Sequence, residues 1–551
     1  MTLIDFDPNQ IQDLEGAQKA LVLVLNLVEE VKQENAQLRE IIQEQRDEIN
    51  RLKGEQGKPD IKPSKKKEEQ KDHSSEKERR RPKKWKKGSK LDKIKVDDEK
   101  VLSVDKSKLP DDAEFKGYES VVIQDLKIET NNIRFKKEKY YSPSTGETWI
   151  APLPTGYEGE FGPQVRSLIM TLYHGSNMTE SKVAEFLSNM GIFISDGQVS
   201  NLLIKKKEVW HAEKDEIYRA GMESGRYQHI DDTSTRVDGE NQYCHIVGNS
   251  LYTAYFTRPR KDRLTIINVL QNLSESQFLL NSYTKQWLET FKTPKWARRL
   301  IEQWPQNEWL AHERIEEWIA TDLARLGKQQ KARVLEAAAL TAYHAQTTMP
   351  VLEVLMSDDA PQFKWLSKEQ ALCWIHDGRH YKKLTPHVPY HQKLLADFRG
   401  KYWEYYTELE QYRATPNETD AVQLRQKFDT LFSTVTGYNN LDERIAKTKA
   451  KKKELLLALE YPEIPLHNNP AELGARQRVR KRDVSFGPRT KEGVQAWDTF
   501  MTLAETAKKL GVSFYAYIYD RVSESYTLPN LADMIRQRSP AFYPVHAPTP
   551  P

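Results

Sequence analysis

The sequence has 551 residues, enough for roughly two to four folded units at a typical ~150 residues per domain. Hydrophobic residues make up 38% of the chain and charged residues 30%, a balance that excludes both a membrane protein and a wholly disordered chain. The longest apolar stretch, residues 20–28, is far shorter than the ~20 residues that span a bilayer.

The cysteine content and the start of the chain bear on the cellular compartment. No basic flank precedes an apolar segment at the N-terminus, so we expect no signal peptide. Cys244 and Cys373 are too few for a disulfide framework or a four-cysteine zinc site. Both observations favour a reducing, bacterial-type cytoplasm or nucleoid, without membrane association.

Residues 1–55 are expected to form a coiled-coil dimerisation helix, because apolar residues recur every seven positions between Leu21 and Leu52. The lone Asn35 in one seam favours parallel, two-stranded pairing in register. The alternative is a single amphipathic helix packed on its own body. The two seams consist of Leu21, Val28, Asn35, Ile42 and Ile49, and of Val24, Val31, Leu38, Gln45 and Leu52.

The net charge of +4 hides a basic segment. Residues 58–95 hold 17 Lys or Arg against 7 Asp or Glu and have almost nothing to bury, so residues 56–108 are expected to be a disordered basic linker. Such a linker can bind nucleic-acid phosphates, or it can be a solvated spacer between two domains. The cations expected to contact phosphates here are Arg79, Arg80, Arg81, Lys83 and Lys84.

Residues 109–160 change to short alternating apolar runs bounded by Gly and Pro. This pattern predicts a small β-rich unit, with strands near residues 120–124 and 133–135. Few large apolar residues are available to such a unit, so the core that it could form on its own is thin.

Residues 161–222 are expected to be helical. Ser195 and Gln198 form a capping-box pattern that predicts the start of a helix. Two short helices around a Gly turn resemble a helix-turn-helix that could read DNA, although such pairs are more often packing units.

Residues 223–523 are expected to form one α/β domain, in which helical excursions over about 274–346 and 391–459 interrupt a sheet. The later strands are nearly continuous apolar runs, which is typical of strands buried on both faces. Residues 524–551 are expected to be a C-terminal tail. Strands are expected near residues 227–230, 243–247, 252–256, 351–356 and 371–375.

Two carboxylate pairs, Asp231 with Asp232 and Asp358 with Asp359, each follow or end an apolar strand. Carboxylates brought together repel one another, and a divalent cation is the usual way to neutralise them. Oxygen-only ligation favours Mg²⁺ or Mn²⁺, and Glu472 as a third acid would complete a two-ion site for phosphoryl transfer. Taken singly, Asp359 could cap a helix and Asp232 could be a turn residue.

Glu472 is expected in the first turn of a helix, because Asn469 or a neighbour can cap that helix and Pro470 suits its start. The helix then presents a run of cations beside the carboxylates, an arrangement that suits a phosphodiester backbone. The cations expected to contact DNA in this part of the chain are Arg258, Arg260, Arg379, Lys382, Arg476, Arg478, Arg480 and Lys481.

The sequence resembles the DDE transposases of bacterial insertion sequences, specifically the TnpC-type transposase, whose element usually encodes further small proteins. The resemblance covers nearly the whole chain. Its most specific segments are Ile230–Thr233, Ser357–Phe363, Cys373–Arg379 and Asn468–Glu472.

This resemblance implies an α/β, ribonuclease-H-like catalytic core with large helical insertions. It also implies that Asp231, Asp358 and Glu472 are the catalytic residues and bind two Mg²⁺ or Mn²⁺ ions. The residues then expected to support this site are Asp232, Asp359, Asn468, Asn469 and His376.

Three features depart from the family pattern. The family's cysteine-based zinc motif is missing before the core, so we expect no structural zinc. The family's Asp-Asn-Asn is replaced by His467-Asn468-Asn469, and its Glu-Arg by Glu472-Leu473. The first two acids lie 127 residues apart, which is consistent with an extra helical insertion.

The sequence therefore predicts a Mg²⁺-dependent DNA transposase that nicks the ends of its element and joins the freed 3′-hydroxyl to target DNA. The expected partners are transposon-end and target DNA, a second copy of the chain bound through Leu21–Leu52, and accessory proteins of the same element. The alternatives are a catalytically silent DNA-binding protein derived from a transposase and a ribonuclease-H-like nuclease that cuts without joining.

Overall fold

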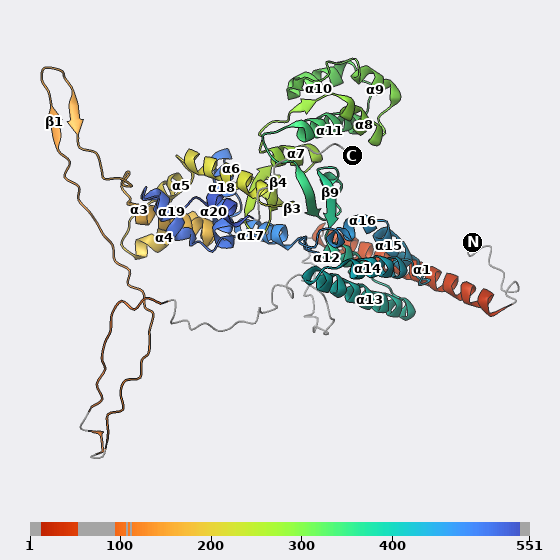
Figure 1. The fold of residues 1–551 in the computed structure, drawn as a ribbon, viewed down its shortest axis with the longest axis horizontal. Helices are drawn as coiled ribbons and strands as arrows, with labels where there is room; N and C mark the ends of the chain where they lie inside the picture. The colour runs from red at the N-terminus through yellow and green to blue at the C-terminus, as the bar shows by residue number, and fades with distance from the viewer. Residues whose placement is uncertain (1–12, 53–93, 106–107, 111–112, 540–551) are drawn as a thin grey trace.

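A computed structural model describes residues 13–52, 94–105, 108–110 and 113–539. Within these residues a five-stranded mixed sheet lies at the centre of the molecule, in the order β5-β4-β3-β8-β9 (Figure 1). Strand β4 is antiparallel to both of its neighbours, β3 and β5, whereas β8 and β9 run parallel to β3. The strands are β3 (Tyr227–Val237), β4 (Glu240–Gly248), β5 (Thr253–Arg258), β8 (Leu352–Ser357) and β9 (Ser367–Leu372).

The β3–β4 hairpin fixes the register of the antiparallel half of the sheet. Its two-residue loop, Asp238-Gly239, has φ values of 49° and 81°. Positive φ at both loop positions is the type I′ geometry, whose twist matches that of the flanking strands. Val237 consequently pairs with Glu240, and Asp231 pairs with Ile246 further along.

Both faces of the sheet are covered by helices. On one face, Val247 and Phe256 join the large core that includes Tyr218 of α6 (Glu208–Glu223), whose ring centroid lies 4.7 Å from that of Phe256. On the other face, Ile246 and Tyr255 pack with Ala475 of α17 (Asn469–Ser485). The alternation of neighbouring side chains between two helical layers explains why these strands are apolar on both faces.

Helix α18 (Lys491–Lys509) closes the β5 edge of the sheet. The backbone N–H of Thr257 donates to Asp498 Oδ2 at 2.6 Å, and those of Tyr255 and Thr253 donate to hydroxyls of α18 at 3.1 and 3.3 Å. The acceptors Asp498, Thr502 and Thr506 are four residues apart and share one helix face. The backbone N–H groups at this edge of the sheet thus bond to side chains of α18 and not to another strand.

One group of helical segments lies between β5 and β8, and a second group follows β9. Between β5 and β8 the elements are α7 (Arg263–Gln271), β6 (Phe278–Leu279), α8 (Ser282–Thr290), α9 (Lys295–Ile301), β7 (Trp309–Leu310), α10 (His312–Thr321) and α11 (Lys328–Ala345). After β9 they are α12 (Trp374–Lys382), α13 (Pro389–Ala414), α14 (Glu418–Leu431), α15 (Asn439–Lys449), α16 (Lys452–Leu455) and η7 (Leu457–Leu459). A short 3₁₀ turn, η6 (Pro361–Phe363), follows β8.

Helices from before and after the sheet pack together at its β5 side (Figure 1). The capping box predicted at Ser195 and Gln198 is present at the start of α5. Part of the expected C-terminal tail, residues 524–551, is the helix α20. Its residues Leu531 and Ile535 are buried, so this helix packs on the core. These helices are α3 (Pro163–Met170), η5 (Thr171–Gly175), α4 (Glu180–Asn189), α5 (Asp196–Ile204), α19 (Phe514–Val522) and α20 (Leu531–Arg538).

The region expected to be a small β-rich unit contains one hairpin, β1 (Lys139–Tyr141) with β2 (Thr148–Ile150). All six of its strand residues are exposed. The predicted strands near 120–124 and 133–135 do not form, and Val121 and Ile123 are 74% and 83% exposed. An alternating pattern without an apolar partner surface does not suffice to make a sheet.

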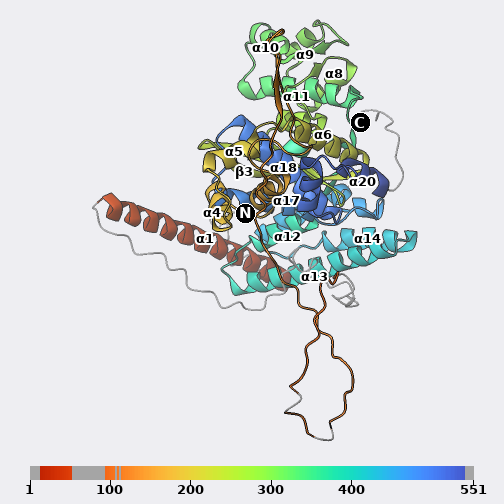
Figure 2. The same cartoon turned by 90° about the vertical axis from the view of Figure 1, so that its left-hand side faces the viewer.

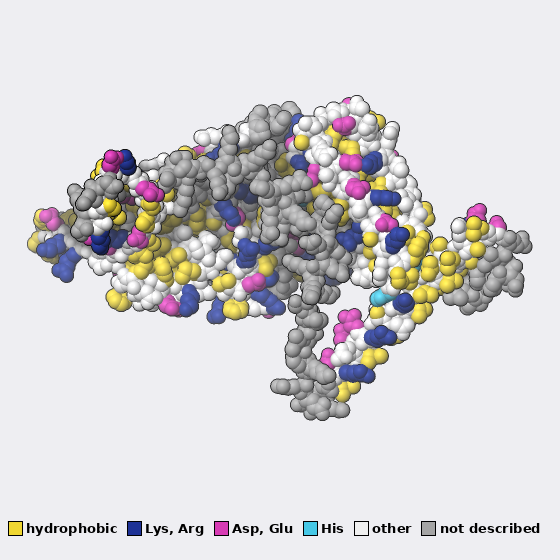
Figure 3. Space-filling view, turned by 90° about the horizontal axis from the view of Figure 1, so that it is seen from below, with side chains coloured by type: hydrophobic (Ala, Val, Ile, Leu, Met, Phe, Trp, Pro, Cys, Tyr) yellow, Lys and Arg dark blue, Asp and Glu magenta, His cyan; other side chains and the backbone are white. Residues whose placement is uncertain are grey.

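Helix α1 (Leu14–Leu52) extends away from the rest of the molecule (Figure 2). Its apolar heptad residues are exposed in this chain, for example Leu38 at 49%, and hydrophobic side chains run along the projecting helix (Figure 3). A different face of α1 is docked, because Asn26 and Glu29 are buried against the segment between β9 and α17. The helix therefore combines both alternatives: it packs on its own chain and leaves its seam uncovered.

Across the described parts of the chain, no helix has both the length and the hydropathy required to cross a bilayer.

Candidate active site

The parallel pairing of β3 and β8 brings the first two predicted acids to the same end of the sheet. His229 pairs with Met356, so Asp231 and Asp358 each follow this pair by two residues, and the Asp358 charge raises the pKa of Asp231. The acids lie near each other because β3 and β8 run in the same direction. Asp358 follows the end of β8 at Ser357, whereas the strand expected near 227–230 extends to Val237, so Asp231 lies inside β3.

Asn468 fixes the third acid to the same edge. Its side-chain amide donates to the Ile230 carbonyl at 2.8 Å, and its Oδ1 lies 2.9 Å from His229 Nδ1. Its backbone N–H donates to the Cys373 sulfur at 3.3 Å. Asn468 precedes α17, whose first turn holds Glu472, as the sequence predicted. Asn468 therefore joins β3, the start of α12 and the start of α17.

The three carboxylates interact electrostatically. Burial, together with the charges of Glu472 and Asp358, raises the pKa of Asp231 to about 7, although the hydrogen bond from the backbone N–H of Asp232 opposes the shift. A carboxylate that stays partly protonated near neutral pH is poorly compensated by its surroundings. Such a group is stabilised as an anion when a cation is bound beside it, and oxygen-only ligands fit Mg²⁺ or Mn²⁺.

Two side chains of α12 contact Glu472. Arg379 donates from Nη2 to Glu472 Oε2 at 3.2 Å, and His376 Nδ1 lies 3.5 Å from Oε1. Arg379 Nη1 also lies 3.0 Å from His376 Nε2. Burial lowers the pKa of His376, although the Glu472 charge raises it, so the imidazole is largely neutral at pH 7. Arg379 is therefore the cation that balances the third acid.

The second aspartate of each pair turns to other partners. Asp359 forms an ion pair with Lys451 at 2.6 Å, and Asp232 accepts a hydrogen bond from Gln362 at 3.1 Å. Both carboxylates thus fix loops around the site. Among the other expected supporting residues, Asn469 is buried, and its backbone N–H donates to His467 Nδ1 at 3.4 Å.

A cleft of about 520 Å³ opens beside Asp358. Its walls combine acidic and basic side chains from the loop after β8, from α12 and from the loop before α16. Sequence reasoning missed Lys383 and Lys451 in these walls, although the lysine run at 449–453 offered a compositional signal. A cleft lined by cations beside a carboxylate cluster can hold a phosphodiester while its charge is neutralised.

Two of the cations expected to contact DNA are buried instead. Arg478 is fully buried, with Nη1 3.4 Å from Asp498 and Nη2 donating to Thr257 at 2.8 Å. Lys481 is also fully buried, and its ammonium donates to the Tyr173 carbonyl at 2.7 Å. Both side chains point toward α18 and the N-terminal helices rather than toward solvent. Their prediction as DNA contacts is therefore wrong in this structure.

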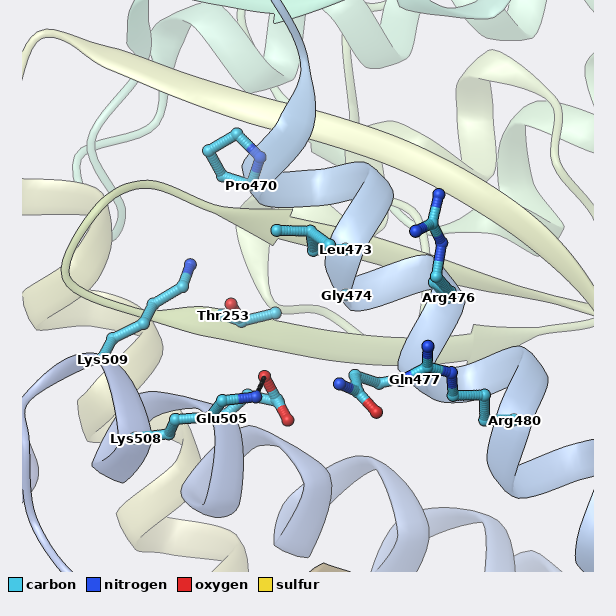
Figure 4. A pocket seen from close by; sticks show the side chains of 10 residues that line it. All are labelled: Thr253, Pro470, Leu473, Gly474, Arg476, Gln477, Arg480, Glu505, Lys508 and Lys509. Carbon is cyan, nitrogen blue, oxygen red and sulfur yellow. Dashed lines mark ion pairs between the residues drawn. The ribbon is translucent and has the colours of Figure 1, made fainter. Parts of the chain in front are cut away.

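Arg476 and Arg480 lie on the outward side of α17, beside a second pocket of about 330 Å³. Figure 4 shows this pocket between α17 and α18, with Lys508 paired to Glu505 at 3.6 Å and Lys509 nearby. The ammonium of Lys509 donates to the Asn249 and Tyr252 carbonyls at 2.6 and 2.7 Å. The pocket therefore has a basic rim.

The remaining predicted DNA contacts differ in exposure. Lys382 and Arg260 are exposed, whereas Arg258 is half-buried, with its guanidinium 5.9 Å from the centre of the Phe256 ring. The linker cations lie outside the described residues, and these are Arg79, Arg80, Arg81, Lys83 and Lys84.

Comparison with known proteins identifies the family. A protein of Sinorhizobium fredii (strain NBRC 101917 / NGR234), named "Uncharacterized protein y4jO", is 32% identical over 315 residues, which are 56% of this chain and 94% of that protein. Residues 314–496 match the family described as "Transposase IS66 family". The chain belongs to the IS66 transposase family.

The IS66 match has a direct bearing on the site. The matched range contains Asp358, His376, Arg379 and Glu472, whereas Asp231 lies before it. The family supports a function related to transposition, with DNA as the partner.

Proposed function

We propose that this IS66 family protein is a DNA transposase that nicks the ends of its element and transfers the freed strand to target DNA. The observation that carries the proposal is the convergence of Asp231, Asp358 and Glu472 at one edge of the sheet, where burial and mutual repulsion raise the pKa of Asp231. These acids come from β3, from the residue after β8 and from α17, so this is a tertiary arrangement and not a local acidic run.

The proposed fold of this core is ribonuclease-H-like. In its support, the sheet has a three-stranded antiparallel meander followed by two strands parallel to β3. Of the proposed catalytic acids, Asp231 lies on β3, Asp358 directly follows the neighbouring strand β8, and Glu472 lies on a helix that covers one face. A central parallel strand pair delivers side chains to the same edge, where chemistry can be arranged.

Asp231, Asp358 and Glu472 would hold a pair of hard divalent cations, Mg²⁺ or Mn²⁺, since Glu472 and Asp358 lie close enough for their charges to raise the pKa of Asp231. Bound there, the ions would lower the pKa of the attacking hydroxyl and stabilise the leaving oxygen. The chain's own part is to hold its acids in register. Asn468 positions α17 against Ile230, and Gln362 and Lys451 restrain Asp232 and Asp359.

Cations near these acids would hold the DNA backbone. The exposed Arg379, Lys382 and Arg480 and the half-buried Arg476 are on α12 and α17, the helices that meet at Glu472. The exposed Arg260 follows β5. Charge neutralisation of phosphates positions a duplex without reading its sequence. The basic linker over residues 56–108 would add affinity that depends on salt.

A second copy of the chain would pair through α1. The seam from Leu21 to Leu52 remains exposed while Asn26 and Glu29 attach the helix to its own chain. The two uses of the helix are therefore compatible. Parallel pairing would bring two sets of carboxylates to two transposon ends.

The test is joining of labelled duplexes that carry the ends of this element, with purified full-length chain in Mg²⁺. Asp231→Asn, Asp358→Asn and Glu472→Gln should each lower joining by about 100-fold or more, whereas the exposed control Glu240→Gln should not. Undiminished joining by any triad variant would refute the assignment. Nicking without joining would indicate a nuclease, and binding without nicking a catalytically silent DNA-binding protein.

A further inference from the structure

A mixed set of donor atoms adjoins the proposed catalytic carboxylates. Sulfur from Cys373, nitrogen from His376 and oxygen from Glu472 all lie within 4.8 Å of one another. Cys373 is the residue that precedes α12, His376 is in the first turn of that helix, and Glu472 is in the first turn of α17. Two helix N-termini thus converge on one small volume.

The donor chemistry differs from that of the aspartates. Magnesium and manganese prefer oxygen, whereas thiolate and imidazole favour zinc and similar transition metal ions. One sulfur, one nitrogen and one oxygen leave a fourth tetrahedral position open, as in zinc sites with three protein ligands. The set is thus suited to Zn²⁺ and unsuited to Mg²⁺.

The Cys373 sulfur lies among backbone N–H groups. It accepts from Asn468 at 3.3 Å and from the backbone of Ile375 and His376 at the start of α12. Burial and the Glu472 charge raise the pKa of the Cys373 thiol to about 12, whereas these three N–H groups lower it. A bound cation is therefore needed to hold the sulfur as a thiolate, which the N–H groups would then help to stabilise.

Two atoms of the cluster lack partners. His376 Nδ1 and Glu472 Oε1 are buried, and neither has a hydrogen-bond partner among the described residues. They lie 3.5 Å apart. Buried polar atoms without partners are costly, and a shared cation would satisfy both. This observation is independent of the sulfur geometry.

Arg379 competes with an ion at this place. Its guanidinium contacts both Glu472 Oε2 and His376 Nε2. Its side chain is 45% exposed, so it can leave the cluster without breaking the core. A cation bound to Cys373, His376 and Glu472 would repel it toward the cleft.

We propose that Cys373, His376 and Glu472 bind one Zn²⁺ ion, and that this ion inhibits the chain by withdrawing Glu472 from the aspartates. Binding releases the thiol proton and forms the sulfur–metal bond without any redox change. The ion binding stands on the cluster itself, whereas the inhibition rests on the proposed transposase function.

Co²⁺ titration of the purified full-length chain tests the site, because thiolate-to-cobalt charge transfer absorbs in the near ultraviolet. One Co²⁺ per chain should give this band, and Zn²⁺ should remove it. Cys373→Ser should abolish the band, and His376→Gln should weaken Co²⁺ binding by at least about 10-fold. Arg379→Ala should tighten binding by several-fold.

Matched controls separate this site from other donors. Cys244→Ser removes the other, buried cysteine, and His380→Gln changes an exposed histidine of the same helix, so both should keep the band. Absence of the band in the unaltered chain, or its persistence in Cys373→Ser, would overturn the proposal. If Cys373→Ser does not fold, an unchanged affinity in His376→Gln would overturn it equally.

Inhibition has its own readout. Added Zn²⁺ should stop joining in Mg²⁺, and Cys373→Ser should require at least about 10-fold more Zn²⁺. A chain that shows the cobalt band but never joins DNA would refute the transposase proposal and leave the ion site intact. A chain that joins DNA but never shows the cobalt band would refute the ion site and leave the transposase proposal intact.

Discussion

The side-chain amide of Asn468 donates a 2.8 Å hydrogen bond to the carbonyl of Ile230, the residue before Asp231. The same side chain contacts the imidazole of His229 at 2.9 Å. Asn468 is 1% exposed, so these bonds form away from water. These hydrogen bonds hold the start of α17, and with it Glu472, against β3, the strand that contains Asp231.

Asn468→Ala should destabilise the protein by about 1–3 kcal/mol, because the Ile230 carbonyl and His229 lose their buried partner. Joining should fall by about 100-fold, since Glu472 would no longer be held against β3. Thermal unfolding and joining rates measure the two effects. Asn189→Ala, at an exposed helical asparagine, should change neither. Full joining by Asn468→Ala would show that α17 is positioned by its packing alone.

Asp231→Asn should abolish joining and stabilise the metal-free protein. Burial and the neighbouring carboxylates make the Asp231 charge unfavourable, whereas an amide keeps the acceptor for the Asp232 N–H and carries no charge. The unfolding midpoint in EDTA should rise by about 2–4 °C for each kcal/mol relieved. Glu240→Gln is the exposed control. A lower midpoint for Asp231→Asn would mean that other contacts compensate the buried charge.

Arg478 and Arg480 separate a structural role from a DNA contact on one helix. Arg478→Met should cost about 3–5 kcal/mol, because Asp498 would remain buried without its cation. Arg480→Met should leave stability nearly unchanged and should lower DNA affinity, with the salt dependence reduced by about one charge. Chemical denaturation and DNA binding at several salt concentrations give the comparison. Equal stability of the two variants would contradict the burial of Arg478.

Lys481 should make stability depend on pH in the alkaline range. Burial, together with the charge of Arg478, lowers its pKa to about 7, although the charge of Glu180 opposes the shift. An unfolded lysine titrates near pH ~10.4, so between these values the unfolded chain binds the additional proton and stability rises with pH. Lys481→Met should reduce this rise relative to wild type. The exposed control Lys491→Met should retain it, and a retained rise in Lys481→Met would contradict the buried lysine.

The three acids could be predicted because each carries a local signal. Asp231 and Asp358 follow apolar strand residues, and Glu472 follows a helix start marked by Pro470. Parallel pairing of β3 with β8 then brings Asp231, inside β3, near Asp358, directly after β8. The buried Arg478 and Lys481 gave no such signal, because α17 has charged residues on several faces and its buried face is chosen by contacts with α18 and distant helices.

The N-terminal helix α1 also has contacts with distant residues that its sequence pattern does not predict. Its seven-residue repeat is visible in the sequence, but the docking of Asn26 and Glu29 depends on partners more than 350 residues away. Polar residues on the flank of an apolar seam are usually solvated, so pattern alone favoured exposure. The strand predicted near residues 120–124 is wrong for the opposite reason: its alternating apolar residues have no partner surface and stay exposed.

Glu29 completes the N-terminus of a helix that it does not belong to. Its carboxylate accepts the backbone N–H of His387 at 2.6 Å and of Val388 at 2.8 Å, and it lies 3.2 Å from His391. Val388 precedes α13 and offers no capping side chain of its own. A carboxylate at this position satisfies free N–H groups and interacts favourably with the helix dipole.

Glu29→Gln should therefore loosen α1 from the chain by about 1–3 kcal/mol, because an amide nitrogen would face one of the two N–H donors. Although burial raises the pKa of Glu29, the bonds to His387, Val388 and His391 hold it below its ordinary value. Its stabilisation is present above the unfolded pKa and is lost as pH falls through the lowered folded value, so docking should weaken below about pH 4. Hydrogen exchange of residues 22–33 measures docking, with the exposed Glu30→Gln as control. Equal protection in both variants at pH 7 would show that the capping bonds do not hold α1 in place.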